Sequence, residues 1–456
     1  MTARASDFTA AADGNWSASG TWTKSNSTND HTYPQADDNI IGNTGAVSIT
    51  LDTGTFDVND LTVGGSSVLF RPTNTTASTV NLNVGGDFTK GLGGGTFSLR
   101  NNSLALLNVG ITGSLDVDSG VLQFGSAAGG QNLNSLTVAG LTTVDSGAVL
   151  NIRTTTAASF ADVTVNGTMN VANFGGAGAS VSSLAGTNGT AAVQVNHGSN
   201  TSGTLTISGS GSSSTTYAGI LRNGSPSSTG GVLSLSKSGT GTQVFSGTTN
   251  TYTGTTQISG GTLLINGNHT GGASYTVAGN ATTSATLGGG GTIVLAADQS
   301  VTISSTDATN KGILAPGTSE TSTATLTLGS AGVATDLVFG ANSRLSINVG
   351  TSTASSRVAL FGDLDLTGST DELFLNSLSG AFDGSTYVIA TYTGSLTGTF
   401  DMITGLDEGY FIDYGTGANS AITLQAIPEP GAVGLLAAAG GLLWTVGNRR
   451  RRLTVA

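Results

Sequence analysis

Cysteine is absent from this chain of 456 residues, and proline, histidine and charged residues are scarce. Without cysteine, the chain can form no disulfide framework, no thiolate zinc site, no iron–sulfur cluster and no cysteine nucleophile. There are six prolines and three histidines, and charged residues make up 9% of the sequence, against about a quarter in a typical protein. The helix formers Glu, Lys and Gln are correspondingly scarce, which argues against a helical bundle.

Glycine, by contrast, supplies 70 positions, and apolar residues make up 37% of the chain. That apolar content argues against a highly charged disordered chain. Abundant Thr, Ser, Asn and Gly beside Val, Ile and Leu indicate a β-rich protein with many turns. This composition is typical of a secreted or surface protein.

The net charge of −12 is unevenly distributed. Residues 1–430 hold all 27 acidic residues but 11 of the 15 basic ones, and the other four are consecutive arginines near the C-terminus. Because an acidic body repels phosphate backbones, we expect no nucleic-acid partner.

Short segments that alternate apolar and polar residues, and then end at a glycine or turn, recur along the chain. They begin at Leu61, Leu82, Leu107, Leu136, Val163, Leu205, Leu264, Leu326 and Leu364. The alternation predicts half-buried strands with glycine at the corners. The first steps are 21, 25, 29 and 27 residues, which predicts the stacked rungs of a parallel β-solenoid. Tandem β-sandwiches are the alternative, and they would need turn signals roughly every 8–12 residues.

One segment, residues 245–267, resembles the autotransporter-associated β-strand repeat. The resemblance is carried by Asn250-Thr-Tyr252-Thr-Gly254 and by the following Gly260-Gly261-Thr-Leu263. It implies a right-handed β-helix displayed at a bacterial surface. The chain has no room after Leu424 for a translocator barrel, so self-secretion is not implied.

The sequence predicts four regions. Residues 1–57 read as an N-terminal cap, residues 58–331 as the β-solenoid, and residues 332–425 as a C-terminal β region rich in aromatic residues. Residues 426–456 form a separate tail. An alternative interpretation is that the C-terminal aromatic residues are exposed and form a carbohydrate-binding face.

The tail contains an uncharged run, residues 431–448, followed by Arg449, Arg450, Arg451 and Arg452. A helix of this length is about 27 Å long, close to the minimum for crossing a bilayer core. We therefore expect one C-terminal transmembrane helix, with the arginines on the cytoplasmic side.

Pro428, Glu429 and Pro430 stand directly before that run. The motif, the apolar run and the basic cluster together resemble the PEP-CTERM sorting signal of Gram-negative bacteria. The resemblance implies an exosortase-type membrane transpeptidase as partner, a precursor held in the inner membrane, and a mature form at the cell surface or in the extracellular matrix. A hydrophobic leader should accompany such a tail, and we expect the gene to encode one upstream of residues 1–16.

Catalytic motifs are sparse. The sequence has no nucleophile elbow, no phosphate-binding loop and no zinc-protease motif. His31, His197 and His269 are isolated, and we expect them in turns or on the surface.

Two carboxylate pairs remain, Asp116 with Asp118 and Asp363 with Asp365. Residues two apart on a strand share a face, so either pair could bind calcium or act on a sugar. We instead read them as outward polar residues of alternating strands. The sequence thus predicts a non-enzymatic structural or adhesion protein without a cofactor or metal, with extracellular polysaccharide as a further partner. The alternative is a polysaccharide-active β-helix lyase or hydrolase.

Overall fold

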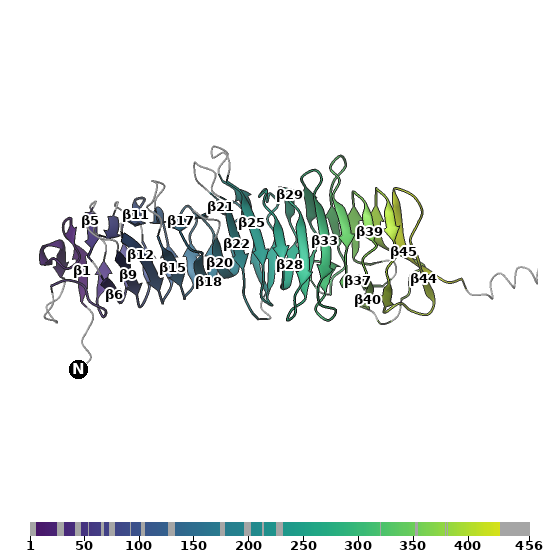
Figure 1. Cartoon of the computed structure of the whole chain (residues 1–456), viewed down its shortest axis with the longest axis horizontal. Helices are drawn as coiled ribbons and strands as arrows, with labels where there is room; N and C mark the ends of the chain where they lie inside the picture. The colour runs from purple at the N-terminus through teal and green to yellow at the C-terminus, as the bar shows by residue number, and fades with distance from the viewer. Residues whose placement is uncertain are drawn as a thin grey trace, which may run out of the picture.

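The protein is an elongated stack of short strands, with its first strands at one end and its last strands at the other (Figure 1). The computed structural model describes residues 6–24, 32–41, 47–52, 54–64, 68–72, 78–91, 93–101, 105–125, 133–173, 178–195, 202–211, 214–224, 231–319, 321–351, 354–378, 380 and 382–428. Segments that follow one another in the sequence also follow one another along the stack. Contacts between rungs therefore join residues about one rung apart in the sequence, as in a solenoid.

Within these ranges the strands form four sheets. The first sheet comprises β1 (Asp7–Ala10), β3 (Trp22–Lys24), β4 (Asn39–Ile41), β6 (Gly54–Val58), β7 (Leu61–Val63), β9 (Ser78–Val84), β10 (Phe88–Lys90), β12 (Ala105–Ile111), β13 (Leu115–Val117), β15 (Ser135–Val138), β16 (Thr142–Val144), β18 (Ala158–Val165), β20 (Ala179–Ala185), β22 (Gly203–Ile207), β25 (Leu233–Lys237), β27 (Thr256–Ile258), β30 (Tyr275–Gly279), β33 (Ser300–Ser305), β36 (Asp336–Phe339), β39 (Leu364–Leu366) and β42 (Leu396–Gly398). The second comprises β2 (Gly14–Asn15), β5 (Val47–Leu51), β8 (Val68–Pro72), β11 (Thr96–Leu99), β14 (Val121–Phe124), β17 (Val149–Thr154), β19 (Thr168–Asn173), β21 (Ala192–Val195) and β24 (Ile220–Asn223).

The other two sheets belong to the C-terminal half. The third comprises β23 (Ser214–Tyr217), β26 (Thr242–Phe245), β28 (Gly261–Ile265), β31 (Ala285–Gly289), β34 (Gly312–Pro316), β37 (Ser343–Val349), β40 (Glu372–Ser377) and β43 (Met402–Thr404). The fourth comprises β29 (Asn268–Gly272), β32 (Thr292–Leu295), β35 (Thr325–Leu328), β38 (Arg357–Leu360), β41 (Thr386–Tyr392), β44 (Tyr410–Asp413) and β45 (Ser420–Ala426).

The solenoid has three faces along its length, but the sheet that forms a given face differs between the N-terminal and C-terminal halves. In the N-terminal half a rung gives two strands to the first sheet and one to the second, as β9, β10 and β11 do before β12, β13 and β14. From β18 on, the two strands of the first sheet are joined into one. The third sheet takes over one row of the first through a bridge from Gly186 to Tyr217. The fourth sheet takes over from the second through bridges from Arg222 to Thr251 and from Asn250 to His269. The chain is therefore one continuous parallel solenoid, as the sequence predicted.

The core is a set of inward rows that run across the strands. One row passes through Leu61, Phe88, Leu115, Thr142 and Val163, which are paired laterally in that order. Each of them is at most 1% exposed. The first three steps along this row are equal in length and the last is shorter, and all fall within the recurrence expected from the sequence. Burying each apolar side chain contributes about 1.5–3 kcal/mol, and every rung repeats that contribution.

Glycine permits close packing where neighbouring rungs turn. A Cβ on Gly140 would lie 2.2 Å from the carbonyl oxygen of Gly113, which occupies the same corner one rung earlier. A side chain there would push the rungs apart, because real Cβ atoms do not approach backbone this closely.

Antiparallel strands occur at both ends of the stack. At the N-terminal end β3 pairs antiparallel with β1, and the buried Trp16 packs edge-on against Trp22 and Phe70. At the C-terminal end β45 pairs antiparallel with β41 and with β44. The limits assigned to the four regions stay a prediction, and so does the right-handedness of the solenoid.

The expected fold class is wrong in one respect, the transmembrane helix. Regular structure in the described residues is β-strand apart from one 3-10 turn, Ser19–Thr21, and no helix there has the length and hydrophobicity to cross a membrane. The expected span, residues 431–448, lies outside the described residues. The expectation depended on a charge-free run of minimal length, and that run contains five glycines, which are poor helix formers.

Candidate functional site: the repeat core and the adjoining cleft

The segment that resembles the autotransporter repeat occupies the change from the second sheet to the fourth. In the described part of the chain no strand lies between β24 and β29 on that face, and Asn250 occupies the position between them. Its side-chain oxygen accepts the Leu221 N–H at 2.8 Å, and its amide nitrogen donates to the carbonyls of Gly247 (2.9 Å) and Asn268 (3.0 Å). Asn250 is 3% exposed. It thus supplies the hydrogen bonds that a strand would make there, which explains an asparagine at this position of the motif.

Tyr252 anchors a buried polar network beneath this position. Its ring stacks on His269, with centroids 3.9 Å apart, and its hydroxyl lies 2.7 Å from Thr256 Oγ1 and 3.0 Å from the Tyr275 hydroxyl. His269 Nε2 lies 2.8 Å from the Tyr252 carbonyl oxygen, and Nδ1 lies 2.8 Å from the Tyr275 hydroxyl. All four side chains are at most 1% exposed.

The carbonyl fixes the direction of every hydrogen bond in this network. Because the Tyr252 carbonyl can only accept, His269 Nε2 carries the proton, and Nδ1 accepts from the Tyr275 hydroxyl. Tyr275 then accepts from Tyr252, which accepts from Thr256. Each donor has an acceptor, so the network is fully satisfied with a neutral histidine.

Burial shifts the acidities in this network accordingly. It lowers the pKa of His269 to about 4, although the hydrogen bond to the Tyr252 carbonyl opposes the shift. Burial also raises the pKa of Tyr252 to about 12 and that of Tyr275 well above its usual value. The prediction that His269 lies in a turn or on the surface is wrong, because His269 is buried in β29. The sequence pattern of such a short strand does not show that one of its polar residues points inward. His31 and His197 lie outside the described residues.

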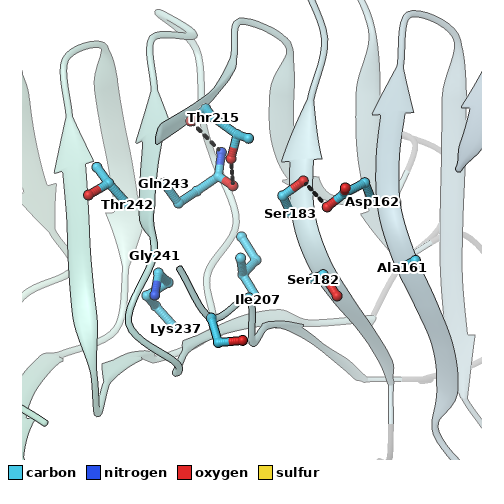
Figure 2. A pocket seen from close by; sticks show the side chains of 12 residues that line it. Ala161, Asp162, Ser182, Ser183, Ile207, Thr215, Lys237, Gly241, Thr242 and Gln243 are labelled. Carbon is cyan, nitrogen blue, oxygen red and sulfur yellow. Dashed lines mark hydrogen bonds between the residues drawn. The ribbon is translucent and has the colours of Figure 1, made fainter. Parts of the chain in front are cut away.

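A cleft of about 270 Å³ opens where β23 diverges from β20. Figure 2 shows Gln243, on β26, hydrogen-bonded to Thr215, its register partner on the adjacent strand β23. The Gln243 amide donates to the Leu184 carbonyl at 2.8 Å, and its oxygen accepts from the Leu184 N–H (3.1 Å) and from Thr215 Oγ1 (3.0 Å). Gln243 therefore satisfies backbone groups that the diverging strand has left unpaired.

The charged groups that line the cleft are already bound. Asp162 accepts a 2.7 Å hydrogen bond from the Ser183 hydroxyl, as drawn in Figure 2. Lys237 donates to the carbonyls of Ser238 (2.7 Å), Gly239 (3.3 Å) and Gly260 (3.2 Å). Burial lowers the pKa of Lys237 to about 8, so it remains mostly protonated at neutral pH. The lining of hydroxyl, amide and bound ionic groups suits hydrogen bonding to a polar ligand.

Lys90 repeats the arrangement of Lys237 in the N-terminal half. It is paired laterally with Val63 and Val117, is fully buried, and donates to the carbonyls of Gly91, Gly93 and Ser119. Both lysines thus occupy apolar positions and use the ammonium to join two successive corners. Neither lysine was predicted from the sequence to have this role.

The two carboxylate pairs do not lie on one strand face. In each pair one residue is in a strand and the other is in the adjoining corner, because β13 ends at Val117 and β39 begins at Leu364. Asp363 accepts the Ser395 N–H at 2.7 Å, and Asp365 accepts the Thr367 N–H at 2.9 Å. Asp363 and Asp365 therefore hold turns.

Asp118 has the most acidic surroundings of the four. Val117 pairs with Val144, so Asp118 follows one strand and Asp145 follows the next. Burial raises the pKa of Asp118, with further contributions from Asp145 and Asp116, while Lys90 lowers it. Among the described residues, no group of three or more His, Asp or Glu side chains could hold a metal ion.

The C-terminal aromatic residues are mainly internal. Five are buried, namely Phe339, Phe382, Tyr387, Tyr392 and Phe400. Phe361, Phe374, Tyr410 and Tyr414 are partly buried, and Phe411 is 43% exposed. The rings pack edge-on or tilted against one another. This packing suits a capping core better than a flat sugar-binding platform.

The sorting motif lies at the limit of the described chain. Pro428 follows β45 and is exposed. Glu429, Pro430 and Arg449, Arg450, Arg451 and Arg452 lie outside the described residues. Their assigned role therefore remains a prediction.

A comparison with protein-family models identifies the repeat. The model of the passenger-associated-transport-repeat matches residues 235–265, which run from β25 to the end of β28 and contain Asn250, Tyr252 and Gly254. A search of curated proteins found no match to this chain. The family match supports an autotransporter-like β-repeat passenger and, coarsely, an exported surface protein. It covers less than a tenth of the chain, so the similarity is to the repeat.

Proposed function

We propose that this chain is a structural or adhesive protein of the bacterial surface or extracellular matrix, without enzymatic activity. The observation that carries the proposal is a passenger-type repeat built into a rung of a continuous solenoid. The solenoid acts as a rigid spacer, because each rung adds backbone hydrogen bonds and apolar burial to its neighbours. Its outer face presents mostly Thr, Ser and Asn side chains, which bind water and polar partners.

The arrangement of the polar groups supports this role. Asp162, Lys237 and Gln243 at the cleft, and His269 in the repeat, hydrogen-bond to the protein itself. A catalytic acid or base needs to reach a substrate proton. Groups already bound within the fold instead serve its rigidity.

We further propose that the chain reaches the surface through its Pro428-Glu429-Pro430 motif, read by an exosortase-type transpeptidase. The exposure of Pro428 just after the last strand supports this route, because a processing enzyme needs an accessible chain. The folded solenoid ends at β45, so cleavage near Pro430 would leave it complete.

Fractionation of native cells, followed by mass spectrometry of the mature C-terminus, tests the route. We expect a surface or extracellular product that ends near Pro430. A variant with Glu429→Ala should remain unprocessed, whereas Ser420→Ala in β45 should be processed normally. Surface-located protein that retains Arg449–Arg452 would contradict the sorting route, and protein confined to the cytosol would contradict the function itself.

A polysaccharide-active enzyme is the second candidate, favoured by the corner that holds Asp118 beside Asp145. Glycoside cleavage uses two carboxyl groups in different surroundings, and burial raises the pKa of Asp118. Incubation with acidic and neutral polysaccharides, with product size as readout, tests it. Chain cleavage that Asp118→Asn abolishes and Asp363→Asn preserves would favour the enzyme.

A further inference from the structure

The second sheet differs in charge from the rest of the body. Its strands contain no Asp or Glu. Four of the seven arginines in residues 1–430 lie on it or directly after one of its strands, namely Arg71, Arg100, Arg153 and Arg222. Because these arginines are far apart in the sequence, the sequence alone did not predict that they cluster. The register of the solenoid brings them to one face.

Three of these arginines lie in a single row across the strands. Leu99 pairs with Phe70 on one side and with Phe124 on the other, and Phe124 pairs with Ile152. The next residue of each strand continues this register, as shown by the hydrogen bonds from Arg100 N to the Phe70 carbonyl (3.2 Å) and from Gly125 N to the Leu99 carbonyl (2.6 Å).

The resulting row reads Arg71, Arg100, Gly125, Arg153. Because Phe70, Leu99 and Ile152 face the core, the arginines that follow them face outward. With neighbouring strands about 4.8 Å apart, the backbones of Arg71 and Arg100 are about 5 Å apart, and those of Arg100 and Arg153 about 10 Å.

Within the described ranges, the arginine row has no acidic partner. Among the described residues, arginine forms an ion pair where Arg344 meets Glu372, and none of the four row-face arginines takes part in one. Arg153 is 5% exposed, and its NH1 nitrogen has no hydrogen-bond partner. Like charges on adjacent strands destabilise a sheet, and a buried unpaired cation costs more. An anion bound at the exposed Arg71 and the partly exposed Arg100 would offset the repulsion between these two charges.

A ladder of side-chain amides extends the row face to Arg222. Arg222 Nε donates to Gln194 (2.6 Å), Gln194 donates to Asn170 (2.7 Å), and Asn170 donates to Asn151 (2.6 Å). Each amide donates its hydrogen bond toward the N-terminal rungs. Asn151, at the end of this ladder, lies two residues before Arg153 on β17 and therefore on the same face of the strand. The row and the ladder together span β8 to β24, six strand spacings or about 29 Å. Asn170 and Gln194 are each 4% exposed, so the ladder orients Arg222 and the contacts to a ligand come from the arginines.

We propose that this face binds a linear acidic polysaccharide along the solenoid axis, with its carboxylate or sulfate groups on Arg71, Arg100 and Arg222. Guanidinium groups suit such anions because they can form paired hydrogen bonds with them. Arg71 is exposed, and Arg100 and Arg222 are partly exposed, so these three make direct contact. The buried Arg153 adds its charge to the field of the row.

The charge of the whole chain favours a polysaccharide over a nucleic acid. The chain carries a net −12, and a duplex has one phosphate per about 1.7 Å of its axis, which the acidic faces would repel. An acidic polysaccharide has more widely spaced charges, closer to the spacing of the row. This inference deepens the proposed adhesive function by giving its partner a chemistry, and it depends on that function only for the cellular location.

Binding of purified full-length chain to immobilised alginate, dextran sulfate, neutral dextran and a double-stranded oligonucleotide tests the proposal, at about 20 mM salt to limit screening. We expect binding to alginate or dextran sulfate and none to neutral dextran. Tighter binding of alginate identifies carboxylate as the preferred group, and tighter binding of dextran sulfate identifies sulfate. Binding that is tightest to the oligonucleotide, or absent for both acidic polysaccharides, overturns the proposal.

Matched variants locate the binding face. Arg71→Gln with Arg100→Gln should weaken binding at least tenfold, about 1.4 kcal/mol. Arg71→Lys with Arg100→Lys keeps the charges but loses the paired hydrogen bonds, so it should weaken binding to a smaller extent. Arg357→Gln is the matched control, because it removes one exposed charge from β38, outside the row. It should change the binding affinity less than twofold, whereas Arg100→Gln should clearly weaken binding. Equal weakening by Arg357→Gln and Arg100→Gln overturns the proposal. If the chain binds acidic polysaccharide as expected but is confined to the cytosol, only the surface function is refuted. If the chain is at the surface but does not bind acidic polysaccharide, only this inference is refuted.

Discussion

Acidification should destabilise the repeat core through His269. The imidazole is neutral and buried in the folded protein, with its pKa lowered from 6.5 to about 4. Between these two values the unfolded chain binds a proton that the folded chain excludes. The stability contributed by neutral His269 is therefore complete above pH 6.5 and is lost progressively as the pH falls toward 4. A difference of about 2.5 pH units at 1.36 kcal/mol each amounts to about 3 kcal/mol.

NMR titration of the imidazole, together with hydrogen exchange of the amides in residues 250–279, measures the effect. The His269 ring signal should stay in its neutral form down to about pH 4.5. Exchange protection in those residues should fall between pH 6.5 and 4, because rungs of a solenoid can open locally. His269→Gln assigns the ring signal and should remove this part of the pH dependence. A His269 signal that titrates near pH 6.5, or a variant with the same pH dependence as the wild type, would refute the reasoning.

Three further substitutions test the packing, with the midpoint of chemical unfolding as the measurement. Thr142→Val should stabilise the protein by about 1 kcal/mol, because the Thr142 hydroxyl is buried among apolar side chains without a hydrogen-bond partner. The matched Thr256→Val should destabilise it by roughly 1–2 kcal/mol, because the Thr256 hydroxyl donates to Tyr252; the same sign for both changes would contradict this account. Asn250→Ala should cost about 2–3 kcal/mol by leaving the Leu221 N–H and two carbonyls unpaired, and a cost below 0.5 kcal/mol (about the size of a neutral surface change) would contradict it.

Local patterns were enough to predict the strands and the solenoid. Alternation marks the buried face of a strand wherever it lies, and a steady recurrence marks stacking, so Leu61, Leu82 and Val163 were recognised as inward residues. The repeat around Asn250 and Tyr252 was recognised from its resemblance to a known family, and the family match over residues 235–265 supports it. The exact register was not predictable. The Leu107 segment matches the Leu82 segment by pattern, yet Leu82 pairs with Val109, because a shift of two residues keeps every side chain on its face.

The sequence by itself determined what depends on neighbours along the chain: all-β structure, inward leucines and valines, glycine corners and recurring rungs. Only the tertiary structure decided what depends on neighbours across rungs. It aligned Arg71, Arg100 and Arg153, buried His269 beside Tyr275, and placed Lys90 and Lys237 at apolar positions. Rung lengths vary, because the step from Val301 to its partner Leu337 is nearly twice as long as the step from Thr256 to its partner Tyr275. Lateral neighbours are therefore set by how each loop closes, and this is determined only when the whole stack has folded.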